Sequence, residues 1–229
     1  MGRVWALVFA FMGSEQPIND YDSSFHRDVH VFAERGLKKA YKSSVIINAF
    51  SGGDNKGVAT GSGNYMKVNG KKFVLTALHV VDGKQNIYVT EKSGASYIAT
   101  VKHIDAYMDI AILEVVGNLN FTKAIEYTTI KSRPMGREVF YCGHPNHSTF
   151  LTFEGRINGT DEQWLTLDIF AWPGSSGSVV FDNEGNAIGI ISAVSLSAPT
   201  GFPVLVPNIV RIGSVSSLSR EKIAEILSE

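Results

Sequence analysis

The sequence predicts an all-β protein of antiparallel strands, arranged as a sandwich or a barrel, with one helix before the strands and one after them. Short runs rich in Val, Ile, Tyr, Phe and Thr recur from residue 44 onward. Clusters of Gly, Asn and Asp separate these runs at intervals of about 8–12 residues, as in all-β folds. No helical periodicity lies between the runs, which argues against alternating strands and helices. The 229 residues suffice for one large domain or two smaller ones.

The region before the strands has three parts. Residues 4–12 are continuously apolar behind one Arg, which is too short to span a bilayer and long enough for the apolar part of a secretory signal. An apolar arm that docks on a partner is the alternative, so contact with a membrane through this segment stays open. Residues 14–24 are polar and predict a linker. Residues 25–41 carry apolar positions at helical spacing and predict a helix.

Turn signals divide the rest of the chain into strands and one final helix. Asn69-Gly70 and residues 183–185 (Asn-Glu-Gly) each predict a tight hairpin turn. In residues 219–229, apolar side chains recur at i, i+3 and i+4 behind Ser219, which predicts a short capped helix. The predicted strands, in chain order, lie in residues 45–50, 65–78, 86–90, 97–104, 110–116, 137–143, 149–157, 164–170, 178–182, 187–194 and 204–210.

Charge and cysteine content exclude several classes of function. The chain has 21 Lys and Arg against 22 Asp and Glu, with no basic block, so we expect no nucleic-acid partner. Cys142 is the single cysteine, so the chain forms no internal disulfide and no cysteine-based zinc site. Because Cys142 lies inside an apolar strand, it is expected to be a buried, inert thiol. We expect no metal and no organic cofactor.

A serine hydroxyl is a weak nucleophile at neutral pH, so catalysis by serine needs a neighbouring base and a group that orients this base. The stretch 172–181, WPGSSGSVVF, offers serines in a glycine-rich turn. His79 is the best candidate base because it leaves an apolar strand just before an Asp-Gly turn. Asp109 is the best orienting group because it begins an apolar strand, where an unpaired carboxylate would be costly. The order His, Asp, Ser is one of the known chain orders of such triads.

Each of these features also has a purely structural interpretation. A Gly/Ser-rich turn is usually only a turn, and a His after a strand is more often a surface residue than a base. Asp105 lies four residues before Asp109 and is interpreted as a loop residue. His144, within a GHPNH turn, is expected at the surface. The joint occurrence of the three candidates, in order and at strand ends, is what favours a catalytic site.

Three segments carry a resemblance to a known family: TALHVV around His79, DIAILEV from Asp109 and PGSSGS around Ser176. Together they resemble the catalytic blocks of trypsin-like serine proteases of the chymotrypsin fold, and they are most similar to the HtrA/Deg branch. The likeness runs from about residue 44 to residue 210, and nothing similar to a PDZ domain follows. Further segments that resemble this branch are GVATGSG (57–63), GREVFYCGHP (136–145) and GFPVLVPNIV (201–210).

The resemblance implies a domain organisation of two antiparallel six-stranded β-barrels. Residues 1–43 would form the apolar arm, linker and helix. Residues 44–125 would form the first barrel, and residues 126–229 the second barrel with the C-terminal helix. The active site would then lie between the barrels.

The resemblance also implies a role for each candidate residue. Ser176 would attack the scissile carbonyl, His79 would take its proton and later donate one to the leaving amine, and Asp109 would orient the imidazole and stabilise its charged form. The backbone N–H groups of Gly174 and Ser176 would form the oxyanion hole. Glycine suits position 174, because a tight turn that aims an N–H group often needs backbone angles that only Gly adopts easily.

The chain departs from the family pattern at two serines of the same turn. Ser175 stands where the family has Asp or Asn, and Ser178 stands where it has a second Gly. Without an acid at position 175, a salt bridge from a newly cut N-terminus cannot order the oxyanion turn. A partner, the substrate or the packing of the turn itself would have to order it.

Substrate preference follows from the residues that the resemblance assigns to substrate binding. Phe170 stands at the position that forms the base of the primary specificity pocket in trypsin-like enzymes. It carries no charge to pair with Lys or Arg, so we expect cleavage after small or apolar residues. Ser192 and Ala193 are expected in the strand that pairs with the substrate backbone.

The sequence therefore predicts a serine endopeptidase that acts on protein or peptide substrates. The alternative is a catalytically inactive protein that keeps the protease fold for binding or assembly, for example in a virion or a secretion complex. An enzyme that cuts one dedicated partner in such an assembly is a third interpretation. A homo-oligomer and an extracytoplasmic or virion-associated location are both compatible with the chain.

Overall fold

The computed structural model describes residues 34–52, 58–130, 135–161, 164–197 and 204–228. All of these belong to one compact unit, Ala33–Glu229. The predicted apolar segment 4–12, the linker 14–24 and the first part of the predicted helix lie outside the described residues. Within the described part of the chain, none of the helices has the length and apolar character needed to cross a membrane.

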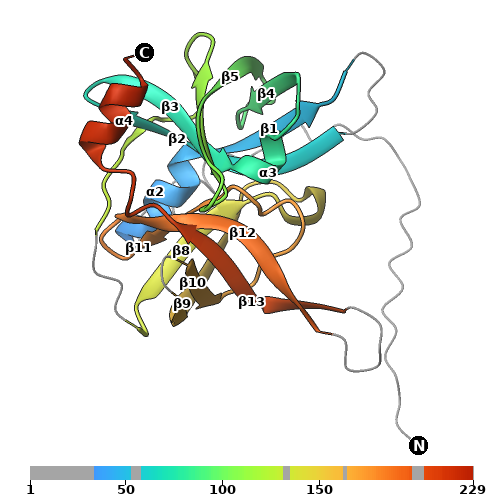
Figure 1. Ribbon diagram of the computed structural model, residues 1–229, viewed down its shortest axis with the longest axis vertical. Coiled ribbons are helices and arrows are strands. Elements are labelled where there is room, and N and C mark those ends of the chain that lie inside the picture. Colours follow the sequence, from blue (N-terminus) through green and yellow to red (C-terminus); the bar gives the residue numbers. More distant parts are fainter. Residues whose placement is uncertain (1–33, 53–57, 131–134, 162–163, 198–203, 229) are drawn as a thin grey trace, which may run out of the picture. The chain divides into compact units, whose positions relative to one another are not determined.

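The first six strands close into an antiparallel ring, in the order β1-β4-β5-β6-β3-β2 (Figure 1). Pairing of β1 with β2 closes this ring, with Ser44 opposite Asn64 and Phe50 opposite Val58. A short strand, β7 (Ile125–Glu126), adds to β2 in parallel. The strands of the ring are β1 (Ser44–Phe50), β2 (Val58–Val68), β3 (Lys71–Ala77), β4 (Asn86–Thr90), β5 (Ser96–Asp105) and β6 (Ile110–Val115).

The next six strands form a second closed barrel, in the order β10-β13-β12-β11-β8-β9. Its strands are β8 (Glu138–Gly143), β9 (Leu151–Asp161), β10 (Trp164–Asp168), β11 (Val179–Asp182), β12 (Ala187–Ser197) and β13 (Val204–Ser214). These two antiparallel six-stranded barrels confirm the predicted all-β, chymotrypsin-like fold.

Local sequence explains the turns and helix ends. Asn69 and Gly70 both have positive φ, 50° and 81°, and make the predicted two-residue turn between β2 and β3. Helix α4 (Arg220–Ile226) begins as predicted, because the Ser219 side chain accepts the Lys222 N–H. Helix α2 (Arg35–Ser43) begins after Glu34, whose ψ of 150° is not helical, so the helix predicted over residues 25–41 is not continuous through Glu34. Helix α2 ends two residues beyond the predicted range, with the Ser43 hydroxyl bonded to the Lys39 carbonyl.

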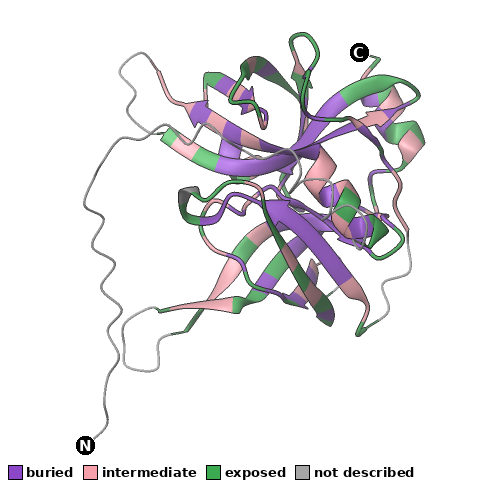
Figure 2. Ribbon diagram, turned by 180° about the vertical axis from the view of Figure 1, so that it is seen from behind, coloured by how far each residue is buried: buried purple, intermediate pink, exposed green. Residues whose placement is uncertain are grey.

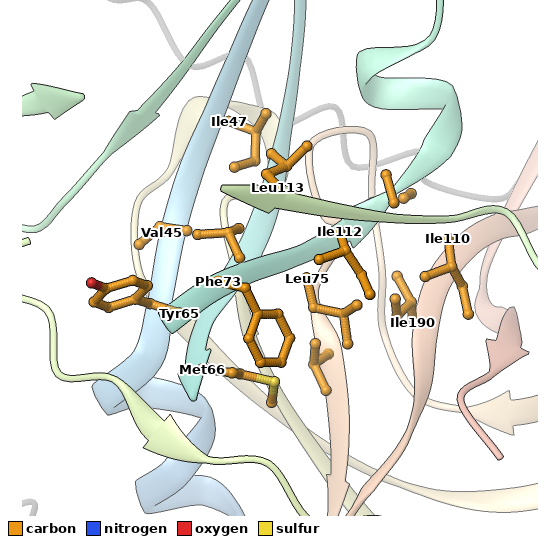
Figure 3. Packing of buried hydrophobic residues seen from close by; sticks show 14 of the residues in the cluster. Val45, Ile47, Tyr65, Met66, Phe73, Leu75, Ile110, Ile112, Leu113 and Ile190 are labelled. Carbon is orange, nitrogen blue, oxygen red and sulfur yellow. The ribbon is translucent and has the colours of Figure 1, made fainter. Parts of the chain in front are cut away.

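Two apolar cores fill the barrels, and the first extends into the second barrel. Figure 2 shows the buried residues along the strands of both barrels. In Figure 3, Phe73, Leu75 and Ile110 of the first barrel lie in the same cluster as Ile190 of β12. Burying a side chain such as Ile or Phe stabilises the fold by about 1.5–3 kcal/mol. The shared cluster therefore couples the two barrels where the candidate site residues meet.

Asn64 joins three elements in this buried region. Its Nδ2 donates to the Ala40 carbonyl at 3.3 Å and the Ser43 hydroxyl at 2.8 Å in α2. Its Oδ1 accepts the N–H of Val179, at the start of β11, at 2.8 Å. A fully buried amide with each polar atom bonded fixes the register of its neighbours. Asn64 thus aligns β2 with the strand that follows the Ser176 turn.

Candidate active site

His79 lies on a single helical turn rather than on the strand itself. β3 ends at Ala77, and α3 (Leu78–Val81) follows at once. The Leu78 N–H donates to the Asp109 carbonyl at 3.1 Å, which ties this turn to the head of β6. The side chain of Val80 is buried and anchors the turn, while the His79 side chain stays 47% exposed. The imidazole can therefore reach a substrate.

Asp109 contacts His79 twice. Asp109 Oδ2 lies 2.7 Å from His79 Nδ1, and Oδ1 accepts the backbone N–H of His79 at 2.9 Å. The residue has φ of 55°, a left-handed conformation that Asp and Asn adopt more readily than most residues. This conformation directs the carboxylate back at α3. The predicted base and its orienting acid are thus brought into direct contact.

The hydrogen bonds of Asp109 keep its carboxylate charged. Burial by itself would raise the pKa of Asp109, but the hydrogen bonds from the His79 ring, the Ser192 hydroxyl and the His79 backbone N–H outweigh it. The pKa of Asp109 therefore lies below its ordinary value. A charged carboxylate accepts a hydrogen bond from the Nδ1–H group and so leaves Nε2 of a neutral imidazole free to act as a base.

Ser192 contributes to this arrangement in a way that the sequence did not predict. Its hydroxyl donates to Asp109 Oδ2, across the boundary between the barrels. The pairing of β12 with β13 is irregular between Ile191 and Ala193, so Ser192 lies at a bulge. Bulges turn a side chain away from the strict alternation of a strand. The side chain of Ser192 therefore supports Asp109, while its place beside Ala193 in the strand that pairs with the substrate stays a prediction.

The turn that carries Ser176 packs directly against the first barrel. The Ser176 carbonyl accepts the Ser62 N–H from β2 at 2.7 Å. A side chain at Gly61 would collide with both Val80 of α3 and the Ser176 carbonyl, with Cβ at 2.7 and 2.9 Å from them. The absence of a side chain at Gly61 thus lets the His79 turn and the Ser176 turn approach the same point of β2.

The peptide groups on both sides of Gly174 have fixed directions. The Pro173 carbonyl accepts the Asn146 N–H at 2.9 Å. In a trans peptide the C=O and N–H point in opposite directions, so the Gly174 N–H points away from Asn146. Gly174 has φ of 103°, and a Cβ there would lie 2.3 Å from the His144 carbonyl. Position 174 therefore requires glycine on two independent grounds.

The N–H groups of Gly174 and Ser176 have no acceptor among the residues that the structure describes. Within the described residues, the backbone hydrogen bonds of the turn use the N–H groups of Ser175, Gly177 and Ser178 but neither of these two. The Ser175 carbonyl accepts the Ser178 N–H at 3.1 Å, which directs the Ser176 N–H the other way. Two unpaired donors on one turn can stabilise an anionic oxygen.

The two unusual serines of the turn differ in their surroundings. Ser175 is buried, and its hydroxyl lies 3.3 Å from the Tyr141 hydroxyl and 3.4 Å from the Trp172 N–H. The Ser178 hydroxyl is also buried and has no hydrogen-bond partner among the described residues. Of these two side chains, that of Ser175 therefore has hydrogen-bond contacts that hold the turn.

His144 corrects a prediction from the sequence. It was expected at the surface and is instead 2% exposed, with Nδ1 accepting the Phe150 N–H at 3.1 Å and Nε2 lying 3.3 Å from the Ser44 hydroxyl. Its ring also meets the edge of Phe150, with 4.5 Å between ring centroids. The imidazole thus links two residues of the loop that follows β8, His144 and Phe150, and anchors this loop on β1.

Burial of His144 predicts a pH dependence of stability. Burial, with a smaller effect from the Lys92 cation, lowers the pKa of His144 to about 4. An unfolded His has a pKa of about 6.5, so between these values the unfolded chain binds the extra proton. The free energy of unfolding should therefore fall by up to about 3 kcal/mol from this group as the pH drops from 7 to 4.

Chemical denaturation at a series of pH values measures this effect. The His144→Asn variant should show a flatter decline of the unfolding free energy between pH 6.5 and pH 4 than the wild-type protein. Equal slopes for the two proteins in this range would contradict the assignment.

An apolar pocket of about 230 Å³ adjoins Ser176. No charged residue occurs among the described residues that line it. Ala193 lines this pocket, as the predicted substrate contact requires, but Phe170 does not. The lining residues are Trp172, Pro173, Ser176, Ile191, Ala193, Val194, Leu196 and Leu205.

Phe170 lies in a neighbouring pocket instead of at the base of this one. Its ring stacks on Phe153 at 5.5 Å between centroids and is 41% exposed. The second pocket, of about 420 Å³, is also lined by Leu151, Asn146 and Trp172. The backbone of Phe170 contacts the second barrel, because the Phe170 carbonyl accepts a hydrogen bond from the Tyr141 hydroxyl at 2.7 Å. The Phe170 side chain thus lies apart from the pocket that adjoins Ser176, and its role in substrate specificity stays a prediction.

The two antiparallel six-stranded barrels define the class of chymotrypsin-fold proteins. Residues 61–190 match the family model of the trypsin-like peptidase domain, and the chain belongs to this family. Within the described residues, no group of three or more His, Cys, Asp or Glu side chains could hold a metal ion.

The chain is similar to curated proteases of the HtrA and Do-like type. The chain is 24% identical over 173 residues to "Serine protease Do-like HtrA" of Bacillus subtilis (strain 168), which covers 67% of this chain and 38% of that protein. It is 25% identical over 182 residues to "Protease Do-like 1, chloroplastic" of Arabidopsis thaliana, covering 69% and 42%. The chain therefore spans about two fifths of the length of these relatives.

Solved structures show the same fold. The "HtrA-type protease AlgW with tripeptide" superimposes with a TM-score of 0.67 at 22% identity, covering 84% of this chain and 62% of that one. The serine endoprotease from Yersinia pestis gives a TM-score of 0.65 at 21% identity, covering 85% and 66%.

Proposed function

We propose that this chain is a serine endopeptidase that uses His79, Asp109 and Ser176 as its catalytic triad. The contact between Asp109 Oδ2 and His79 Nδ1 at 2.7 Å carries this proposal, because it orients the ring for a base at Nε2. Membership of the trypsin-like peptidase family supports the role of Ser176. The apolar pocket beside Ser176 supports a peptide substrate.

The chemistry proceeds through an acyl-enzyme. Ser176 Oγ attacks the scissile carbonyl carbon while His79 Nε2 takes the hydroxyl proton. The carbonyl oxygen becomes an oxyanion that accepts hydrogen bonds from the N–H groups of Gly174 and Ser176. His79 then gives its proton to the leaving amine as the C–N bond breaks. Water, deprotonated by the same imidazole, releases the acyl group and restores Ser176.

The proposed specificity is for an apolar or small residue immediately before the scissile bond. The pocket of about 230 Å³ offers Ile191, Val194 and Leu205 as apolar walls. Burying a Val or Leu side chain there contributes about 1.5–3 kcal/mol, whereas a Lys or Arg would lose water without gaining a charged partner.

Hydrolysis of a panel of fluorogenic peptides tests this proposal. The wild-type protein should cleave after Ala, Val or Leu with kcat/KM at least about tenfold higher than after Lys or Arg, as expected from 1.4 kcal/mol of differential binding. Ser176→Ala should abolish cleavage of all members, while Ser195→Ala, a half-buried serine on β12, should not. Best cleavage after Arg and Lys would contradict the apolar preference, and hydrolysis by Ser176→Ala would contradict the triad.

A further inference from the structure

Ser62 of β2 connects the candidate oxyanion turn to two other segments. Its hydroxyl, which is fully buried, donates to the Gly174 carbonyl at 2.7 Å. The same oxygen accepts the His144 backbone N–H at 3.1 Å. The Ser62 carbonyl accepts the Thr76 hydroxyl at 2.7 Å, close to the end of β3. One residue thus links the Ser176 turn, the loop that follows β8, and the strand that leads to His79.

The contact on the Gly174 carbonyl has a specific consequence for the oxyanion turn. Gly174 lacks a side chain, so its φ and ψ are restrained only through the groups bonded to the peptides on either side. The Asn146 N–H holds the Pro173 carbonyl on one side, and the Ser62 hydroxyl holds the Gly174 carbonyl on the other. Together these two bonds fix the direction of the Gly174 N–H.

The turn has few other side-chain anchors. Ser175 stands where the family has Asp or Asn, and the contacts of its hydroxyl with described residues are 3.3 and 3.4 Å long. Hydrogen bonds between hydroxyl groups and carbonyl oxygens have their optimum near 2.7–2.8 Å. The bond from Ser62 has that length, so it is the stronger restraint on the turn.

We propose that Ser62 is a positioning residue for catalysis: its hydroxyl orients the Gly174 N–H toward the oxyanion. This inference rests on the proposed function. It means that a residue of the first barrel orders a turn of the second barrel. The hydrogen bonds of the Ser62 hydroxyl within the described residues go to the Gly174 carbonyl and the His144 N–H, and not to His79, Asp109 or the Ser176 hydroxyl. Removal of the Ser62 hydroxyl also leaves the His144 N–H and the Gly174 carbonyl without this partner in a buried place.

Kinetics of Ser62→Ala test the proposal, with Ser62→Thr as the variant that keeps the hydroxyl. Loss of an oxyanion donor lowers kcat by about 10²–10³, and disorder of one donor should lower it by about 10- to 100-fold. We expect that fall in Ser62→Ala with KM within about threefold of wild type, and recovery of most of kcat in Ser62→Thr. A peptide trifluoromethyl ketone forms a tetrahedral adduct that carries an oxyanion, so its affinity for Ser62→Ala should fall by the same factor as kcat/KM. The affinity of Ser62→Ala for a cleaved product peptide should equal that of the wild-type protein.

Ser178→Ala is the matched control, because Ser178 is a buried serine beside the same turn whose hydroxyl has no partner among the described residues. It should keep the wild-type kcat. Thermal unfolding of each variant establishes that it is folded at the assay temperature. A Ser62→Ala variant that retains kcat, or that loses product affinity and kcat equally, overturns the positioning role. A wild-type protein without hydrolysis or covalent labelling overturns the proposed function, and the role of Ser62 with it.

Discussion

Asp109→Asn is expected to lower kcat about ten-thousandfold without unfolding the protein. The amide of Asn would place an N–H group where Oδ2 now accepts from His79 Nδ1 and from the Ser192 hydroxyl. The imidazole would then accept a hydrogen bond at Nδ1 from this amide and carry its own proton at Nε2, so Nε2 could not take the proton of Ser176. Asn also tolerates the φ of 55° at this position, so the backbone is retained.

Steady-state kinetics with a peptide ester or amide substrate measure this loss. Asp105→Asn is the matched control, because Asp105 lies in the same segment and its Oδ1 accepts the N–H groups of Tyr107 and Met108. An amide oxygen can replace that cap, so Asp105→Asn should stay within about threefold of wild-type kcat. If Asp109→Asn kept more than about a tenth of the wild-type kcat, Asp109 would not orient the base.

Gly177→Ala is expected to destabilise the fold by at least about 3 kcal/mol and to separate the Ser176 turn from the first barrel. A Cβ at this position would lie 2.1 Å from the Ser62 carbonyl oxygen and 2.3 Å from Thr76 Oγ1. The first of these belongs to the backbone of β2, which cannot move without breaking its pairing. The φ of 91° adds strain for any residue with a side chain.

Gly117→Ala separates the steric clash of a Cβ from the strain of a positive φ. Gly117 has φ of 93°, almost the value at Gly177, but a Cβ there would meet no atom within 4 Å. Its substitution should cost only the strain of a positive φ, about 1 kcal/mol. Chemical denaturation of both variants measures the difference. Equal losses of stability would show that the close approach of Gly177 to β2 is not what holds the turn.

The fold and the pairing of His79 with Asp109 follow from local sequence patterns. Both residues stand at the ends of apolar runs, and a closed barrel brings the ends of β3 and β6 together because these strands are paired neighbours. Asn69-Gly70 likewise determines its hairpin through a requirement for positive φ. Features of this kind depend on residues that are close in sequence or on strands that pair along their whole length.

Long-range packing decided the features that the sequence did not reveal. His144 follows β8 in a polar GHPNH turn, and its burial depends on Ser44, a hundred residues earlier. The pairing of β10 with β9 shifts between Thr166 and Leu167, so simple alternation does not give the direction of Phe170. Ser192 is likewise redirected by a bulge. Ser62 lies in the GVATGSG segment, which resembles the protease family. Its hydroxyl contacts the Gly174 carbonyl only when both barrels are folded and packed together.

The most direct test of the central claim is intact-protein mass spectrometry after reaction with a fluorophosphonate, followed by peptide mapping. A serine activated by His79 and Asp109 should form one covalent adduct, located on Ser176. Wild-type protein and Ser178→Ala should both be modified, and Ser176→Ala should not. An unmodified wild-type protein would contradict the proposal and favour an inactive protein that keeps the fold for binding or assembly. An adduct on another serine would contradict the assignment of Ser176.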